Sequence, residues 1–165
     1  MMPTVVLRDI VTDEDRAMAL TVEVRPDQHE FVPPVAQSFL EAIEDARACP
    51  RMWTAFDGDT PVGFAMISDG IPADVLAADP HLMGPYYLWR LMVDHRHQRS
   101  GYGTAILDAV VAYVRTRPGA DHLLTSCTLG EGTPLPFYER YGFVATGRYE
   151  EGEPVLRLDL TTEDA

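Results

Sequence analysis

The order of apolar and polar positions divides the chain into runs with strand and helix periods. A β-branched and aliphatic run predicts a first strand at residues 4–10, and Thr12 followed by three acidic residues is typical of a helix start. Two further runs, 52–57 and 60–68, flank a Gly-Asp pair at 58–59, so their spacing and turn chemistry predict a β-hairpin.

A period of 3.6 residues predicts two longer helices. Prolines in the first turn, with Phe39, Leu40 and Ile43 on one face, predict a helix over 33–48. The apolar stripe of residues 103–115 is the strongest helical pattern in the chain, and it stops before a Pro-Gly pair. We expect both helices to bury their apolar faces against a sheet.

The strand before that second helix, at 86–93, is apolar almost throughout, which predicts a central strand buried on both faces. The last third predicts a strand, a short helix and a hairpin across an acidic turn, at 122–129, 134–141, 142–148 and 155–160. The order is strand, two helices, three strands, helix, strand, helix and two strands, which indicates an α/β mixed sheet. Residues 69–85 contain three prolines and only a weak helical patch at 75–78, so we expect a long connection there.

Composition narrows the functions that such a domain can have. The 165 residues fit a single domain spanning 1–165. A net charge of -13 disfavours nucleic acid and anionic membranes as partners, and favours cations such as polyamines or aminoglycosides, although acidity can also serve solubility alone. Two cysteines are too few for a zinc cage, and no leader or long apolar run is visible, so we expect a cytoplasmic protein without a metal.

Candidate chemistry lies between the buried strand and the strong helix, at residues 95–104. Backbone N–H groups at a helix N-terminus lack helical partners, and Gly101 and Gly103 permit close approach of a ligand. Arg96 and Arg99 add cationic donors, so the turn is suited to a pyrophosphate. The sequence fits neither a Walker A loop nor the dinucleotide-binding fingerprint.

Two segments resemble motifs of the GNAT family of N-acetyltransferases. QRSGYG at 98–103, after the strand ending at Val93, is similar to the family's Q/R-x-x-G-x-G/A motif, and FYERYGF at 137–143 resembles its closing Tyr-x-x-x-Gly-Phe segment. The resemblance covers nearly the whole chain. Within the family, the pattern is most similar to bacterial spermine/spermidine acetyltransferases.

The resemblance implies a mostly antiparallel sheet of about seven strands, splayed between strands 4 and 5 and flanked by about four helices. It also implies acetyl-CoA as cosubstrate, with Tyr138 protonating the departing thiolate. The implied cofactor-binding residues are the backbone of one strand end for the pantetheine arm and the following turn for the pyrophosphate: Leu91, Met92, Val93, Gln98, Arg99, Ser100, Gly101, Tyr102, Gly103 and Thr104.

The proton acceptor is less defined, because an ammonium substrate must lose a proton to a carboxylate or a water. We take Glu30 and Glu131 as the leading candidates, with Glu23 and Asp69 behind them. Glu131 stands seven residues before Tyr138, where many relatives of the family have an Asn.

Other polar and aromatic residues carry simpler expectations. Arg90, inside an apolar strand, predicts an ion pair, and Trp53 and Trp89 are expected in the core. His95 and His97 flank the turn and could contact a phosphate, although exposed loop histidines are the default expectation. In the implied fold, the connection 69–85 would lie where an acceptor enters.

The resemblance therefore implies direct acetyl transfer to a primary amine of a small cationic substrate, with polyamine as our first choice. Alternatives with the same chemistry are an aminoglycoside or other amine antibiotic, or a protein amine. An alternative of another class is a non-catalytic acyl-CoA-binding regulatory module. A homodimer is a possible assembly.

Overall fold

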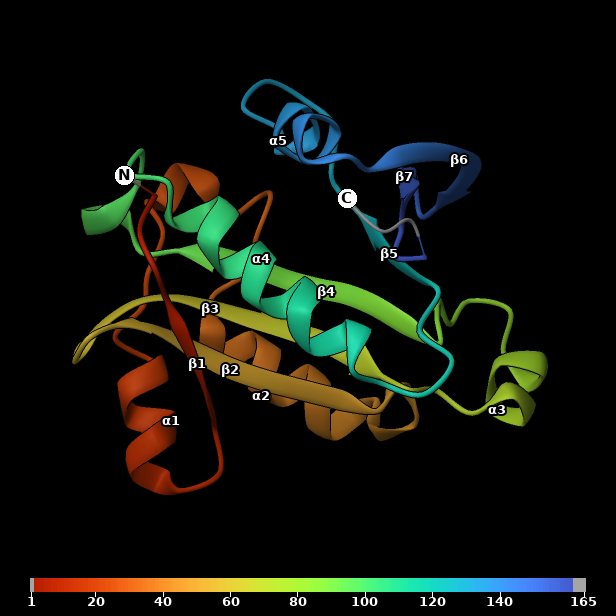
Figure 1. Ribbon diagram of the computed structural model, residues 1–165, viewed down its shortest axis with the longest axis horizontal. Coiled ribbons are helices and arrows are strands. Elements are labelled where there is room, and N and C mark those ends of the chain that lie inside the picture. The colour runs from red at the N-terminus through yellow and green to blue at the C-terminus, as the bar shows by residue number, and fades with distance from the viewer. Residues whose placement is uncertain (1, 162–165) are drawn as a thin grey trace.

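The computed structural model describes residues 2–161, which form one seven-stranded sheet with helices on both faces (Figure 1). The strand order is β1-β2-β3-β4-β5-β7-β6. The strands are β1 Val6–Asp9, β2 Pro50–Asp57, β3 Thr60–Asp69, β4 Tyr86–Val93, β5 His122–Ser126, β6 Val144–Glu150 and β7 Glu153–Asp159. The helices are α1 Asp13–Ala19, α2 Val35–Glu44, α3 Ala73–Ala78, α4 Tyr102–Arg115 and α5 Leu135–Tyr141, with 3-10 turns η1 Pro26–Gln28, η2 Ala46–Ala48 and η3 His95–His97.

Local sequence signals explain several of these boundaries. The hydroxyl of Thr12 accepts the N–H of Asp15, and the Asp15 carboxylate accepts the N–H of Thr12, so a complete capping box starts α1. Gly58 has a φ of 61° in the turn between β2 and β3, a left-handed conformation that costs glycine little. The predicted helix start and hairpin are confirmed.

The sheet opens between β4 and β5. These two strands are the parallel pair, and they are in register at Tyr87 with Leu124 and Leu88 with Thr125. Beyond this short ladder β5 turns away, carrying β6 and β7 with it, as Figure 1 shows. The mixed sheet and the splay between its fourth and fifth strands are confirmed.

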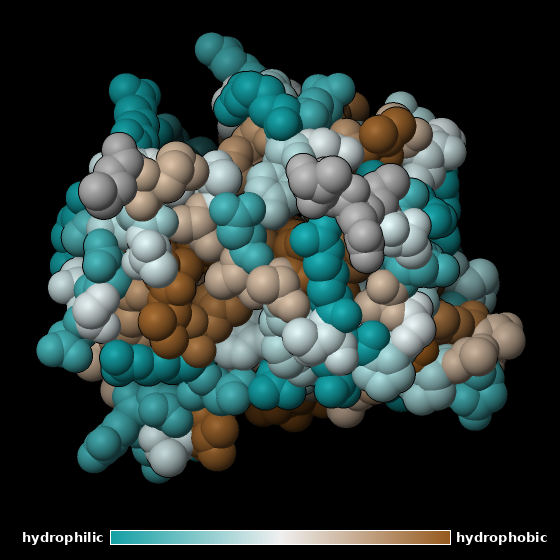
Figure 2. All heavy atoms as spheres, in the orientation of Figure 1, coloured by the Kyte–Doolittle hydropathy of each residue, from teal (hydrophilic) through white to brown (hydrophobic). Residues whose placement is uncertain are grey.

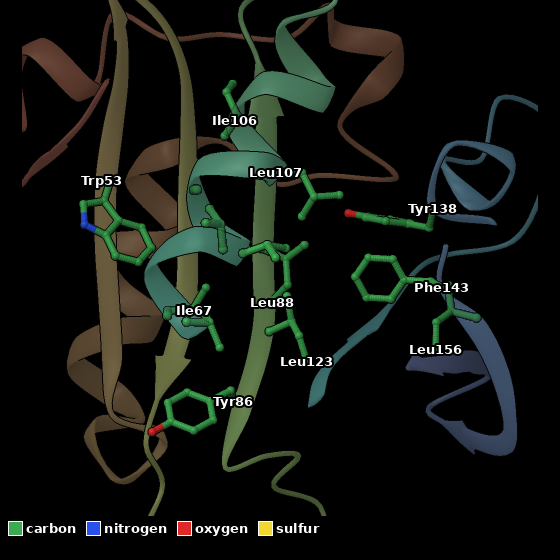
Figure 3. Close-up of a cluster of buried hydrophobic side chains, with 14 of the residues drawn as sticks. Trp53, Ile67, Tyr86, Leu88, Ile106, Leu107, Leu123, Tyr138, Phe143 and Leu156 are labelled. Carbon is green, nitrogen blue, oxygen red and sulfur yellow. The ribbon is translucent and has the colours of Figure 1, made fainter. Parts of the chain in front are cut away.

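Apolar clusters on both faces hold the helices against the sheet. One cluster packs α4 and α5 against β3, β4 and β5, and Ile106, Leu107 and Leu123 are fully buried in it (Figure 3). The other packs α1 and α2 against the opposite face, around Phe64 and Met66. The end of β4 is therefore fixed from both sides.

The structure corrects two expectations about helices. A fifth helix, α3, forms inside the segment that we expected to be a long connection, and Pro72 stands at its N-cap. On α2, Leu40 and Ile43 are exposed rather than buried. The buried face instead runs through Val35, Ser38, Phe39 and Ala42, whose spacing of three and four residues is regular for a helix. No helix among residues 2–161 is long and apolar enough to span a membrane.

Candidate functional site

A pocket of about 750 Å³ occupies the opening between β4 and β5. Its walls come from the segment between α1 and α2, the end of β4, the turn before α4, the end of β5, and α5. In Figure 2 the upper edge of the molecule is hollowed between the part that carries the start of α4 and the part that carries α5. A volume of this size is in the range of pockets for small molecules and cofactors.

The end of β4 presents backbone groups to this pocket. Asp94 donates its N–H to the carbonyl of Val62 and so faces β3. Because backbone groups alternate sides along a strand, those of Leu91 and Val93 face away from β3. On that side β5 pairs only with Tyr87 and Leu88, which leaves the backbone of Leu91 facing the opening. Leu91, Met92 and Val93 all line the pocket, and the register makes Leu91 and Val93 the residues whose amides face it.

The turn after β4 presents a run of backbone donors. None of the six N–H groups from Arg99 to Thr104 donates a hydrogen bond to any residue that the structure describes. Arg99 has a φ of 64° and Gly101 a φ of 84°, and Gly101 is the N-cap of α4. Successive amides in such a turn, together with the positive end of the helix dipole, form an anion site.

Most of the predicted cofactor-binding residues meet at this pocket. Its lining includes Leu91, Met92, Val93, Gln98, Arg99, Gly101, Tyr102, Gly103 and Thr104. Ser100 lies in the same turn but is exposed and outside the lining. The Gln98 side chain donates to the carbonyl of Val93 at 3.1 Å and to Gln28 Oε1 at 2.9 Å, so it fixes the turn to β4 and to η1.

The two arginines of the turn have different roles. Arg96 donates through Nε to Asp94 Oδ1 at 2.8 Å and through Nη2 to the carbonyl of Thr21, so it is committed to the protein rather than to a phosphate. Asp94 is fully buried and also accepts the N–H of Glu23. Burial alone would raise its pKa, but the hydrogen bonds from Arg96 and Glu23 prevail and lower the pKa of Asp94 to about 2. Arg99 lines the pocket.

Tyr138 lies at the inner wall of the pocket, next to Cys127. Its ring points from α5 toward α4 and β4 (Figure 3), and it packs against Phe137 and Phe143 with ring centroids 5.4 Å apart in both pairs. Burial, with the neighbouring Cys127 and Tyr87, raises the pKa of the Tyr138 phenol well above its ordinary value. The phenol is therefore protonated at neutral pH and can act as a proton donor.

The candidate carboxylates do not gather at one place. Glu30 lines the pocket from the segment before α2, whereas Glu131 is exposed and outside the lining. Glu23 is exposed as well, and its backbone N–H is bound by Asp94. Asp69 lies at the end of β3, where Tyr113 and Arg117 donate to it, so it belongs to a structural network away from the pocket.

Sequence reasoning missed several residues of the pocket wall. Trp89, expected in the core, packs against the cluster around Phe64 and Met66 but is only partly buried and also lines the pocket. A register shift in the β3–β4 ladder interrupts the alternation at this residue. Tyr87, Ser126 and Glu153 line the pocket too, and no sequence motif marks them. The predicted ion pair of Arg90 is confirmed, since its Nη2 lies 2.5 Å from Glu41 Oε2.

The connection 69–85 contributes no lining residue. It contacts β6 instead, where Arg148 Nη2 donates to the carbonyl of Pro80 at 2.8 Å and His81 Nδ1 lies 3.3 Å from Glu150 Oε2. Within residues 2–161, no group of three His, Cys, Asp or Glu side chains is placed to hold a metal ion. The pocket thus combines a turn suited to an anion, strand amides that face the opening and a buried phenol.

Comparisons with known proteins agree with this geometry. Spermine/spermidine N(1)-acetyltransferase of Bacillus subtilis (strain 168) is 27% identical over 154 residues, which covers 91% of this chain and 95% of that protein. An acetyltransferase of the GNAT family from Desulfovibrio desulfuricans is similar in structure, with a TM-score of 0.63 and 25% identity over 96% of this chain and 100% of that one. Aminoglycoside acetyltransferase AAC(6')-Ib, solved with paromomycin and acetyl-CoA, has a TM-score of 0.72 at 19% identity, covering 98% and 99% of the two chains. The model of the Acetyltransferase (GNAT) family matches residues 18–143, and the chain therefore belongs to the GNAT family of acetyltransferases.

Proposed function

We propose that this acetyltransferase moves the acetyl group of acetyl-CoA to a primary amine of a small cationic molecule, with a polyamine as the first choice. The observation that carries the proposal is the run of six amides from Arg99 to Thr104, which have no hydrogen-bond partner among residues 2–161 and lie at the same pocket as the end of β4 and the phenol of Tyr138. An anion-binding turn, strand amides and a proton donor in one pocket suit acetyl transfer from acetyl-CoA to an amine.

The residues present fit acetyl-CoA as cosubstrate. The amides at the start of α4 suit a pyrophosphate, and Arg99 supplies a cation at the same turn. Leu91 and Val93 offer strand amides, which suit a chain that itself carries amide groups, although the carbonyl of Val93 already accepts from Gln98. Acetyl-CoA supplies an acetyl group activated as a thioester and a thiol leaving group.

The protein contributes a proton donor and a shaped, partly apolar pocket. We assign Tyr138 as the group that would give its proton to the departing sulfur, and its burial, which raises the pKa of the phenol, would keep it protonated until then. The amine that attacks must be neutral, so an ammonium group must first lose a proton to a water or a carboxylate at the pocket. Glu30 remains a candidate acceptor for that proton because it lines the wall.

The preference for a cationic acceptor rests on charge and on similarity. The net charge of -13 attracts polyamines and aminoglycosides alike. The curated relative is named for spermine and spermidine, whereas the AAC(6')-Ib structures support an aminoglycoside as the alternative acceptor. A protein amine is a further alternative with the same chemistry.

Three wider expectations belong to this proposal. We expect a single domain over residues 1–165, and the sheet supports this because it joins the seven strands described within residues 2–161. A cytoplasmic location is consistent with two free thiols, Cys49 and Cys127. Assembly as a homodimer is an expectation that size-exclusion chromatography with light scattering tests.

The proposal is tested by measuring thiol release from acetyl-CoA with spermidine, spermine, kanamycin and a lysine-containing peptide. We expect turnover with the polyamines, and a preference for kanamycin or the peptide would favour the corresponding alternative. Tyr138→Phe separates an enzyme from a binding module, because the variant should still bind CoA but release thiol about 100-fold more slowly. No turnover of any acceptor, with CoA binding intact, would support the non-catalytic module.

A further inference from the structure

Residues at the end of β5 point alternately to the two faces of the sheet, and each face meets a different side of the pocket. Thr125 lies next to the Tyr138 phenol, and Cys127 packs with Tyr138 in the cluster under α4 and α5. Ser126 and Thr128 alternate with these two residues along the chain. They point to the opposite face of the sheet, because both hydroxyls donate to Glu153. Glu153 therefore meets the pocket from the face of the sheet opposite the phenol.

The carboxylate of Glu153 is fixed by two donors. Ser126 Oγ donates to Oε1 at 3.1 Å, and Thr128 Oγ1 donates to Oε2 at 3.2 Å. Because the Ser126 proton is used in this way, Tyr87 must donate its own proton to Ser126 Oγ, at 2.7 Å. Two hydroxyls thus donate directly to one carboxylate, and the Tyr87 hydroxyl extends this hydrogen-bond chain through Ser126.

The carboxylate retains acceptor capacity toward the pocket. An ionised carboxylate can accept about four hydrogen bonds, and Ser126 and Thr128 use two of those positions. Glu153 and Glu30 are the acidic side chains of the pocket lining, and Glu153 is the one held in place by hydrogen bonds from side chains on the neighbouring strand. No arginine or lysine within residues 2–161 forms a salt bridge with Glu153.

The neighbouring groups suit a cation. Tyr87 and Trp89 line the same side of the pocket, and aromatic rings attract ammonium groups. Arg90 is the cation of β4 on this side, but its guanidinium is paired with Glu41 of α2 at 2.5 Å. Its charge is therefore largely balanced by Glu41, and within residues 2–161 the other cations of the lining, Arg99 and Arg140, form no salt bridge with Glu153.

We propose that Glu153 binds an ammonium group of the acceptor, holding the acceptor on the face of the sheet opposite Tyr138. Ser126 and Thr128 are positioning residues that fix the carboxylate. The ligand class is an alkyl polyamine or another flexible polycation, since one ammonium group bound at Glu153 leaves a second amine free to reach between β4 and β5. This inference rests on the proposed function for the identity of the ligand.

The test is calorimetric titration of spermidine into the protein saturated with CoA, for the natural sequence and for Glu153→Gln. We expect spermidine to bind about 10- to 100-fold more weakly to the variant, as for loss of one hydrogen bond to a charged group. CoA affinity should be unchanged. In turnover, KM for spermidine should rise by a similar factor while kcat stays within about threefold.

Glu151→Gln is the matched control, because it makes the same charge change two residues away on an exposed turn. Equal weakening in both variants would mean that only net charge matters and would overturn the proposal. So would unchanged spermidine affinity in Glu153→Gln, absence of spermidine binding to the natural protein, or a fall in kcat with KM unchanged. Spermidine binding through Glu153 without turnover would instead contradict the proposed function and leave this site standing.

Discussion

Asp94 offers a sharp test of how the end of β4 is held in place. The substitution Asp94→Asn removes the charge from a fully buried carboxylate that ties the turn before α4 to the segment after α1. An Asn side chain can accept only through its oxygen, and its NH₂ group then faces a donor of Glu23 or Arg96. We therefore expect a lower free energy of unfolding and a turn that is held less tightly.

The magnitude follows from the pKa of Asp94. Its shift from the ordinary value of 3.8 to about 2 corresponds to about 2 kcal/mol of stability. A lowered pKa in the folded state contributes stability that is fully present above the unfolded value, near pH 4, and is lost as the pH falls toward 2. At pH 3, roughly half of it, about 1 kcal/mol, should already be lost.

The assay is urea denaturation of the natural protein and of Asp94→Asn between pH 7 and pH 3. We expect the variant to be less stable by about 2 kcal/mol at pH 7, with the difference narrowing by about 1 kcal/mol at pH 3. Asp59→Asn, at an exposed turn position, serves as the matched control and should change stability by less than about 0.5 kcal/mol. A difference that stays constant with pH, or no destabilisation at pH 7, would refute the reasoning.

Two glycines give further predictions. Gly63→Ala places a Cβ against Ile106 Cδ1 and 2.5 Å from the carbonyl oxygen of Met92. Thermal denaturation should therefore show that the free energy of unfolding falls by about 1 to 3 kcal/mol. A variant as stable as the natural protein would contradict this packing. At Gly103 a Cβ would lie 3.4 Å from the Phe137 ring, beside the cofactor turn. Gly103→Val should therefore weaken CoA binding about tenfold or more in titration while the protein still folds, and unchanged CoA affinity would argue against the turn as the binding site.

Elements with strong local signals could be predicted from the sequence. The hairpin of β2 and β3 follows from turn chemistry around Gly58, and α4 from its apolar stripe, because both depend on neighbours in the chain. Helix α3 has only a weak helical pattern, at 75–78, and the prolines around it favour a connection, although Pro72 is well tolerated where a helix begins. On α2, the buried face is the one that packs against the sheet. The residues of the helix alone do not determine which face that is.

The two halves of the site also differ in how far local sequence predicts them. The proposed cofactor half is continuous in sequence, from Leu91 to Thr104, so its residues can be predicted without the fold. The other half assembles Tyr87, Ser126 and Glu153 from three strands that meet only through the sheet order β4-β5-β7. The acidic turn near Glu153 gave a hairpin signal, and nothing in it revealed that one carboxylate would face a pocket.

The most direct test of the account is mass spectrometry of spermidine after incubation with acetyl-CoA and either the natural protein or Tyr138→Phe. The account predicts spermidine carrying one acetyl group, formed in step with released CoA, and formation about 100-fold slower with the variant although its CoA affinity is unchanged. Acetylated spermidine produced equally fast by Tyr138→Phe would contradict the role of this phenol as proton donor. Absence of acetylated product with the natural protein would contradict the polyamine acceptor itself.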